Sequence, residues 1–374
     1  MTVDARLSRI VEDLSDSFTG ELSIDAVQCA MYGSDGSLYQ VPPVGVACPR
    51  TREDVVALVR YARENRLTLV PRGSGSSVTG GALGRGIVVD FSRHMRRMEV
   101  LDDETVRVQP GVVLDDLNRR LRSLGCYLPP DPANAAVTTI GSMLAVDAAG
   151  SHAVSVGSMR DHVRRIELLT SDGDIWNVAT ESVPHEQPFD EPLTAADRRQ
   201  VVLSRLATAL DRYESEITRI AANGLKRRGG GYFVYGVRRD QTIDLPRLLV
   251  GSEGTLGIFT EATLHTLPLP VHRGAMLILF DTLETAARAV TRLVDEDPAA
   301  CDLLDRRLLS LAREASTEFA RLIPVTAEAA LILEWSGWSA AEVRNRLDRY
   351  QRMIRGFVPS CMVQCEATTP APSP

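Results

Sequence analysis

The stretch Pro71-Arg72-Gly73-Ser74-Gly75-Ser76-Ser77-Val78-Thr79-Gly80-Gly81 decides how the rest of the sequence is interpreted. It follows a short apolar run at 67–70 that is typical of a strand. A Gly-x-Gly pattern after a strand is found in Rossmann folds, where the glycine-rich turn opens a helix. Here more glycines follow at 80, 81, 84 and 86, and the next apolar run, 87–91, again indicates a strand. The Rossmann interpretation is therefore rejected.

The loop nevertheless has the composition of an anion-binding segment. Consecutive small residues allow backbone N–H groups to converge on a phosphate, and the hydroxyls of Ser74, Ser76, Ser77 and Thr79 stand beside them. Arg72 either adds positive charge or forms a structural ion pair. Taken alone, the segment also fits a plain glycine-rich turn.

Three further segments rich in small residues follow in the sequence. The proline-rich stretch 129–132 leads to a run of small and apolar residues at 138–145. A second segment comprises 150–152 and 157–163, and a third, 250–258, places three glycines before the start of a strand. Such residues let a flat ring or another backbone approach closely.

The order and spacing of these four segments resemble the FAD-linked oxidases of the vanillyl-alcohol oxidase and p-cresol methylhydroxylase fold. Within that family the sequence is most similar to the bacterial glycolate, D-lactate and D-2-hydroxyglutarate dehydrogenase branch, from about Asp25 to beyond Arg307. The resemblance implies an α+β fold class: a two-subdomain FAD-binding fold of the p-cresol methylhydroxylase type, followed by a partial ferredoxin-like α+β cap domain.

The expected organisation has four parts. We expect an N-terminal helical extension at 1–35 and an FAD-binding domain at 36–271 with a helical insertion at about 180–224. A partial substrate cap domain at 272–366 and a disordered tail at 367–374 follow. Strands near 274–280, 329–335 and 361–365 should alternate with helices near 283–295 and 340–355 in the cap.

The resemblance also implies which residues contact FAD. In the family, the glycine-rich loop wraps the pyrophosphate, and the segment that matches 130–142 follows the ribityl chain and flavin. The segment that matches 157–163 borders the adenosine, and the one that matches 253–258 closes over the cofactor. The positions carried over are Arg72, Gly73, Ser74, Gly75, Ser76, Ser77, Gly80, Pro130, Asp131, Thr138, Thr139, Gly141, Ser142, Gly157, Asp161, Val163, Glu253, Gly254 and Ile258. For the carboxylates of Asp161 and Glu253, a structural hydrogen-bonding role is the alternative. No histidine lies within 72–77, where some relatives attach FAD covalently, so we expect non-covalent FAD.

Two residues are candidates for catalysis. Relatives commonly have arginine where His152 stands and tyrosine where Val156 stands, and a neutral histidine cannot bind a substrate carboxylate as arginine does. His152 is therefore a candidate proton acceptor beside the flavin, or a structural histidine. Lys226 lies in a basic segment before Tyr232 and could contact an anionic substrate, or belong to an exposed loop.

The implied reaction is the oxidation of a 2-hydroxy acid, of the D-lactate, glycolate or D-2-hydroxyglutarate type, by hydride transfer to flavin N5. The six histidines form no cluster like the one that binds metal and substrate in the second half of the family, and the six cysteines are scattered, so no metal site is predicted. We therefore expect an iron–sulfur or cap-completing partner chain. The alternative is an FAD-holding subunit or fragment that needs a second chain for catalysis.

Composition excludes other classes of protein. A net charge of -7 argues against nucleic-acid binding, which requires a concentrated basic surface. No apolar run is long enough for a transmembrane segment, and the N-terminus lacks the pattern of a signal peptide. The expected location is cytoplasmic.

Overall fold

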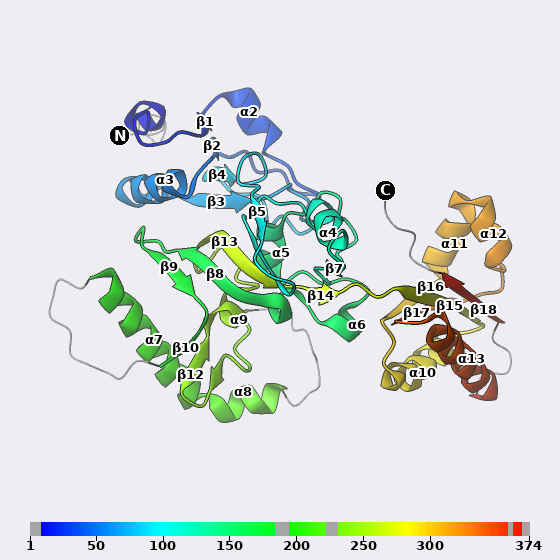
Figure 1. Cartoon of the computed structure of the whole chain (residues 1–374). Helices are drawn as coiled ribbons and strands as arrows, with labels where there is room; N and C mark the ends of the chain where they lie inside the picture. The colour runs from blue at the N-terminus through cyan, green and yellow to red at the C-terminus, as the bar shows by residue number, and fades with distance from the viewer. Residues whose placement is uncertain (1–8, 184–193, 222–230, 358–361, 369–374) are drawn as a thin grey trace. The chain divides into compact units, whose positions relative to one another are not determined.

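The chain folds into two compact units, shown in a computed structural model that describes residues 9–183, 194–221, 231–357 and 362–368 (Figure 1). The first unit comprises residues 1–128, 132–148 and 158–267, and the second comprises 129–131, 149–157 and 268–374. Two short segments, 129–131 and 149–157, therefore belong with the C-terminal unit although the sequence places them inside the FAD-binding region. Each unit is described by itself.

The first unit opens with a four-stranded sheet in the order β1-β2-β4-β3. Strand β1 runs antiparallel to β2, whereas β2, β4 and β3 are parallel. The strands are β1 (Glu21–Ser23), β2 (Gly45–Cys48), β3 (Leu69–Arg72) and β4 (Ile87–Asp90). The expected N-terminal helical extension at 1–35 is thus only partly helical: α2 (Ala26–Met31) lies in it, but β1 already belongs to the sheet.

Helix α3 (Arg52–Asn65) packs against this sheet. Thr51 caps its N-terminus in a capping box with Asp54, and the helix ends at Arg66 in the left-handed conformation. Its apolar face buries Val55 and Leu58 completely. The helix therefore positions β3 and the glycine-rich loop that follows it.

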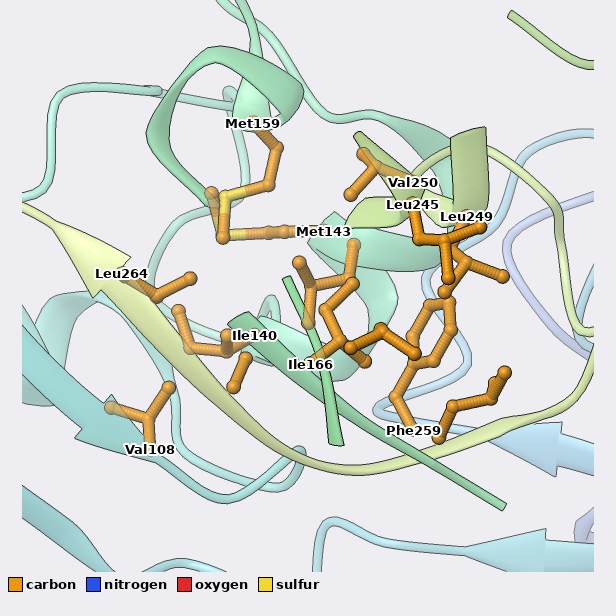
Figure 2. Close-up of a cluster of buried hydrophobic side chains, with 14 of the residues drawn as sticks. Val108, Ile140, Met143, Met159, Ile166, Leu245, Leu249, Val250, Phe259 and Leu264 are labelled. Atoms are coloured by element: carbon orange, nitrogen blue, oxygen red, sulfur yellow. The ribbon is translucent and has the colours of Figure 1, made fainter. Parts of the chain in front are cut away.

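A second sheet forms the main core of the first unit. Its order is β5-β6-β13-β8-β9, and every neighbouring pair is antiparallel. The strands are β5 (Met98–Val100), β6 (Thr105–Val108), β8 (Val163–Leu169), β9 (Ile175–Val178) and β13 (Ile258–His265). Helices α4 (Leu114–Arg122), α5 (Ile140–Val146) and α9 (Leu245–Leu249) contribute to the same core. Figure 2 shows Ile166 of β8 and Phe259 of β13 with Leu245 and Leu249 of α9 in this cluster.

Among its described residues, the region expected as a helical insertion contains two helices and the short strand β10. The periodicity at 203–220 predicts one long helix, whereas the structure has α7 (Ala195–Arg212) and α8 (Glu214–Ala221), separated at Tyr213. A three-stranded sheet joins β10 (Thr180–Ser182), β12 (Thr242–Asp244) and β11 (Arg238–Arg239). Short elements elsewhere are β7 (Cys126–Tyr127), α6 (Ala153–Val156), η1 (Met159–His162) and β14 (Leu267–Pro268).

The second unit contains an antiparallel sheet in the order β16-β17-β15-β18. Its strands are β15 (His272–Phe280), β16 (Ala300–Asp305), β17 (Ala329–Gly337) and β18 (Met362–Thr368). Counted along the chain, this order is 4-1-3-2, the βαββαβ arrangement of a ferredoxin-like fold. The predicted α+β class is therefore confirmed, and the predicted strands and helices of the cap are present.

Helices cover this sheet from both sides. Helices α10 (Leu283–Leu293) and α13 (Ala340–Phe357) bury a core in which Trp335 stacks on Tyr350 with ring centroids 4.3 Å apart. Helices α11 (Arg306–Ala315) and α12 (Thr317–Leu322) pack on the other face around Leu279 and Leu309; these helices are not predicted from the sequence. Helix η2 (Val294–Glu296) extends α10. Within the described residues, no helix has the length and apolarity to cross a membrane.

Candidate cofactor site

The first unit contains a cavity of about 830 Å³. Three stretches supply most of its wall: the glycine-rich loop at 71–82, residues 132–148 around α5, and the turn at 251–259. This volume lies within the range of small-molecule and cofactor sites. The cavity brings together segments almost 190 residues apart in the sequence.

The glycine-rich loop has no room for side chains where it meets α5. Gly75 has a φ of +73°, and a Cβ there would overlap the Nη2 atom of Arg72. A Cβ at Gly73 would overlap the hydroxyls of Thr139 and Ser142. Glycine is therefore required by conformation at 75 and by close approach at 73.

Arg72 holds the loop through backbone carbonyls. Its guanidinium donates to the carbonyl oxygens of Tyr32 at 3.1 Å and Ser34 at 3.0 Å, and it lies 5.2 Å from the centre of the Tyr32 ring. The Tyr32 hydroxyl in turn donates to Asp90 at 2.7 Å. Arg72 lines the cavity, but its guanidinium forms these hydrogen bonds, which hold the loop in place.

Helix α5 begins at the cavity wall. Thr139 is its N-cap, and its Oγ1 accepts a hydrogen bond from the Ser142 backbone N–H at 3.4 Å and lies 2.9 Å from the Ser142 hydroxyl. Thr138 and Thr139 are both buried. The sequence showed only a run of small residues here; the tertiary structure folds most of that run into a helix.

A buried ion pair forms part of the cavity wall. Arg160 lies 3.1 Å from Asp147, and both side chains are less than a tenth exposed. The Arg160 guanidinium also donates to the carbonyl oxygen of Val250 at 2.6 Å and packs 4.0 Å from the centre of the Phe233 ring. Sequence reasoning missed Asp147 and Arg160, although Arg160 lies in the segment 157–163 that it singled out.

The turn at 251–257 carries the least usual backbone of the site. Gly251, Glu253 and Gly254 all have φ between +51° and +85°. The hydroxyl of Ser252 is buried and has no hydrogen-bond partner among the described residues, yet Ser252 lines the cavity. A buried hydroxyl without a hydrogen-bond partner destabilises the folded chain. The Ser252 hydroxyl is therefore suited to a hydrogen bond with a bound group. Ser252, like Asp147, is absent from the set predicted from sequence.

The structure places most predicted cofactor residues in the cavity wall. Those that line it are Arg72, Gly73, Gly75, Ser76, Ser77, Thr138, Thr139, Gly141, Ser142, Glu253, Gly254 and Ile258. Those outside its lining are Ser74, Gly80, Pro130, Asp131, Gly157, Asp161 and Val163. Asp161 instead forms a capping box with Ser158 and lies 3.5 Å from Arg247, the structural role given above as the alternative. Pro132 and Asn134, which follow in the sequence, line the cavity.

The two candidate catalytic residues are not part of this cavity wall. Lys226 lies outside the described residues. His152 belongs to the second unit, where Nδ1 lies 2.6 Å from Asp131 and Nε2 lies 3.2 Å from Glu334. Hydrogen bonds that the ring donates to Asp131 and, with a smaller effect, to Glu334 raise the pKa of His152 to about 9. Both ring nitrogens therefore act as donors near neutral pH, which leaves no lone pair to accept a proton.

The cavity and the residues around it fit FAD. It has the size of a cofactor site, a loop of close backbone approach at 73–77, and a buried hydroxyl without a partner at Ser252. The described residues contain no cluster of three or more histidine, cysteine, aspartate or glutamate side chains that could hold a metal ion. Together with the cap, this arrangement defines a flavoprotein of the p-cresol methylhydroxylase fold.

Comparison with known proteins identifies the family. Residues 43–179 match the FAD binding domain and residues 269–366 match the C-terminal domain of FAD linked oxidases. The chain belongs to the FAD-linked oxidase family, and the predictions of this family and of FAD are confirmed. Two solved structures of alkyldihydroxyacetonephosphate synthase share the fold, with TM-scores of 0.68 and 0.65 at 18% identity, covering 97% and 92% of this chain and 60% and 59% of theirs.

Curated relatives include two bacterial D-2-hydroxyglutarate dehydrogenases. The Pantoea ananatis protein is 32% identical over 319 residues, and the Escherichia coli protein is 33% identical over 307 residues. The matches cover 80% and 79% of this chain but 30% of each relative. The glycolate oxidase subunit GlcD of Bacillus subtilis is 28% identical, with 87% of this chain and 57% of the relative covered. The chain thus spans less than a third of the length of these dehydrogenases.

Proposed function

We propose that this chain is the FAD-binding part of an FAD-dependent dehydrogenase that oxidises a 2-hydroxy acid of the D-2-hydroxyglutarate, D-lactate or glycolate type. The observation that carries the proposal is the cavity formed by the loop at 71–82, helix α5 and the turn at 251–259. It occurs in a chain whose relatives are named for the oxidation of these acids.

Bound FAD would supply the oxidising chemistry by accepting a hydride. The chain's own residues hold and orient the cofactor. The backbone N–H groups of 73–77 are available for the pyrophosphate, and Ser252 offers a buried donor. Arg72 and the Asp147–Arg160 pair keep the surrounding walls in place. Because His152 donates from both nitrogens, we assign the base for the substrate hydroxyl to another group, and Lys226 remains the candidate contact for an anionic substrate.

A second candidate is an FAD-holding part that works with further chain or with a partner subunit. The share of each relative's length that this chain covers favours this candidate. That share is 30% for the hydroxyglutarate dehydrogenases and 57% for a protein named as a subunit of glycolate oxidase. An iron–sulfur or cap-completing partner would fit this role.

Anaerobic stopped-flow spectra near the oxidised-flavin band decide between these proposals. The FAD-loaded chain is mixed in turn with D-2-hydroxyglutarate, D-lactate, glycolate and an alditol. Bleaching by one of the acids, but not by the alditol, supports the dehydrogenase. If the chain needs a partner, bleaching will be at least ~100-fold slower than in the Escherichia coli relative, which corresponds to roughly 2.7 kcal/mol of transition-state stabilisation. Bleaching by the alditol alone would overturn the proposed substrate class.

A further inference from the structure

His152 lies between two carboxylates in the second unit. Its Nδ1 is 2.6 Å from Asp131 Oδ2, its Nε2 is 3.2 Å from Glu334 Oε2, and its backbone N–H donates to Asp131 Oδ1 at 3.3 Å. The imidazole side chain is 22% exposed. Three parts of the chain meet at this ring: the loop 129–131, the N-terminus of α6 and strand β17.

Among the described residues, the charged groups near the ring come from the loop 129–131 and from strands β15, β16 and β17. Glu334 on β17 faces the imidazole, and Arg273 on β15 acts on Glu334 to lower its pKa, after the larger effect of His152 itself. On β16, Asp302 lies on the same sheet face as Glu334, because Ala300 pairs with Glu334 and Asp302 pairs with Ile332. With Asp131 on the loop, the ring therefore sits among acids that favour its charged form.

The loop held by His152 continues directly into the cofactor cavity. Pro132, the residue after Asp131, lines the cavity, as does Asn134. Prolines at 129, 130 and 132 fix φ on both sides of Asp131, which limits the backbone freedom of this loop. Gly150 packs against the Asp131 carbonyl so closely that a Cβ would overlap it, and the chain just before Gly150, at 145–148, also lines the cavity.

We propose that His152 is a positioning residue, whose side chain clamps the loop 129–131 to strand β17 and so couples its own protonation to the affinity of the chain for FAD. The charged imidazole bonds both carboxylates at once. A neutral imidazole can donate to only one of them, and the other carboxylate is then left facing a lone pair. One of the two hydrogen bonds that join the loop 129–131 to strand β17 through the ring is then lost. Pro132 and Asn134 consequently lose their fixed position in the cavity wall.

The test measures the FAD dissociation constant of the full chain by quenching of flavin fluorescence between pH 6.5 and 9.5. For the unsubstituted chain we expect affinity to fall about fivefold over this range as His152 loses its proton. His152→Arg keeps a positive charge at every pH in this range. Its affinity for FAD should therefore change less with pH than that of the unsubstituted chain. The titration of FAD itself is common to both proteins and cancels in this comparison.

Two neutral variants and one control complete the experiment. His152→Gln and Glu334→Gln should bind FAD weakly even at pH 6.5, with little further loss as the pH rises. His272→Gln, on β15, should behave as the unsubstituted chain. Equal pH profiles for the unsubstituted chain and His152→Arg, or unchanged affinity in folded His152→Gln, would overturn the proposal. The readout is cofactor binding, so the result is independent of whether the chain oxidises a hydroxy acid.

Discussion

The guanidinium of Arg160 lies 3.1 Å from the carboxylate of Asp147, and both residues line the cofactor cavity with side chains that are less than a tenth exposed. Asp147 also accepts a hydrogen bond from the Arg160 backbone N–H at 3.0 Å, and it ends helix α5 in the left-handed conformation. The pair thus joins the end of α5 to the segment before β8. Breaking it by removing one partner leaves a buried charge uncompensated.

Asp147→Ala should therefore lower the free energy of unfolding by about 3–5 kcal/mol. Glu216→Ala, which removes the exposed Arg219 pair of helix α8, should have a much smaller effect, because an ion pair at the surface contributes little to stability. Urea denaturation of both variants measures the difference. Equal effects of the two substitutions would mean that the Asp147 pair is not a structural support of the site.

Gly75→Asp should abolish FAD retention. Its Cβ would overlap Arg72, and its carboxylate would bring negative charge to the cavity wall. Gly125→Asp is the matched control, because Gly125 has a φ of +78° but open space at its Cβ position. Both variants carry about 1 kcal/mol of backbone strain, but only the first should lose flavin absorbance after gel filtration. Full flavin content in soluble Gly75→Asp would show that the loop does not bind the pyrophosphate.

Ser252→Ala should weaken FAD binding about five- to tenfold, because the cofactor loses one buried donor. In the chain without FAD the substitution should be neutral or slightly stabilising, since the Ser252 hydroxyl has no partner among the described residues. Thr266→Val is the control: its hydroxyl is likewise buried and unpartnered among those residues, but it does not line the cavity. Titration with FAD and thermal melts of both variants provide the comparison. Similar FAD affinities for the two would rule out a contact with Ser252.

The stability of the second unit should depend on pH through His152. Its pKa in the folded chain, about 9, lies above the ordinary value of 6.5. Its stabilising contribution is therefore complete below about pH 6.5 and is lost as the pH rises through 9. Because Asp131 and Glu334 are about a third exposed, we expect a loss of about 1–2 kcal/mol. The difference in urea midpoint between the unsubstituted chain and His152→Gln should shrink from pH 6 to pH 9.5; a constant difference would contradict the raised pKa.

FAD should be released from the chain by acid or heat. No histidine lies within residues 72–77, and Arg72 uses its guanidinium on backbone carbonyls. After precipitation with acid, flavin fluorescence should appear in the supernatant. A pellet that keeps its fluorescence would show covalent attachment.

Much of the fold could be predicted from local patterns. Thr51, with acids at 53 and 54, predicts the start of α3, and the capping box is present. The alternation of strands and helices after 271 predicts the ferredoxin-like unit. By contrast, the periodicity at 203–220 does not reveal the break at Tyr213, and nothing in the sequence indicated α11 and α12. Short-range patterns specify single helices and strands. Where a helix breaks, and whether a further helix forms, depends on which apolar faces pack against other parts of the folded chain.

The sequence by itself determined the family, the cofactor and the segments that surround it. Gly75 has a positive φ, and Gly73 lies where the hydroxyls of Thr139 and Ser142 leave no room for a Cβ, and this glycine pattern can be recognised without a structure. Only the tertiary structure decided what the charged residues do. Arg72 binds carbonyls, Arg160 pairs with Asp147, and His152 is held between Asp131 and Glu334, which is 182 residues away in the chain. The reason is physical: a glycine's role follows from its own backbone, whereas the role of an ionisable side chain depends on neighbours brought by distant parts of the chain.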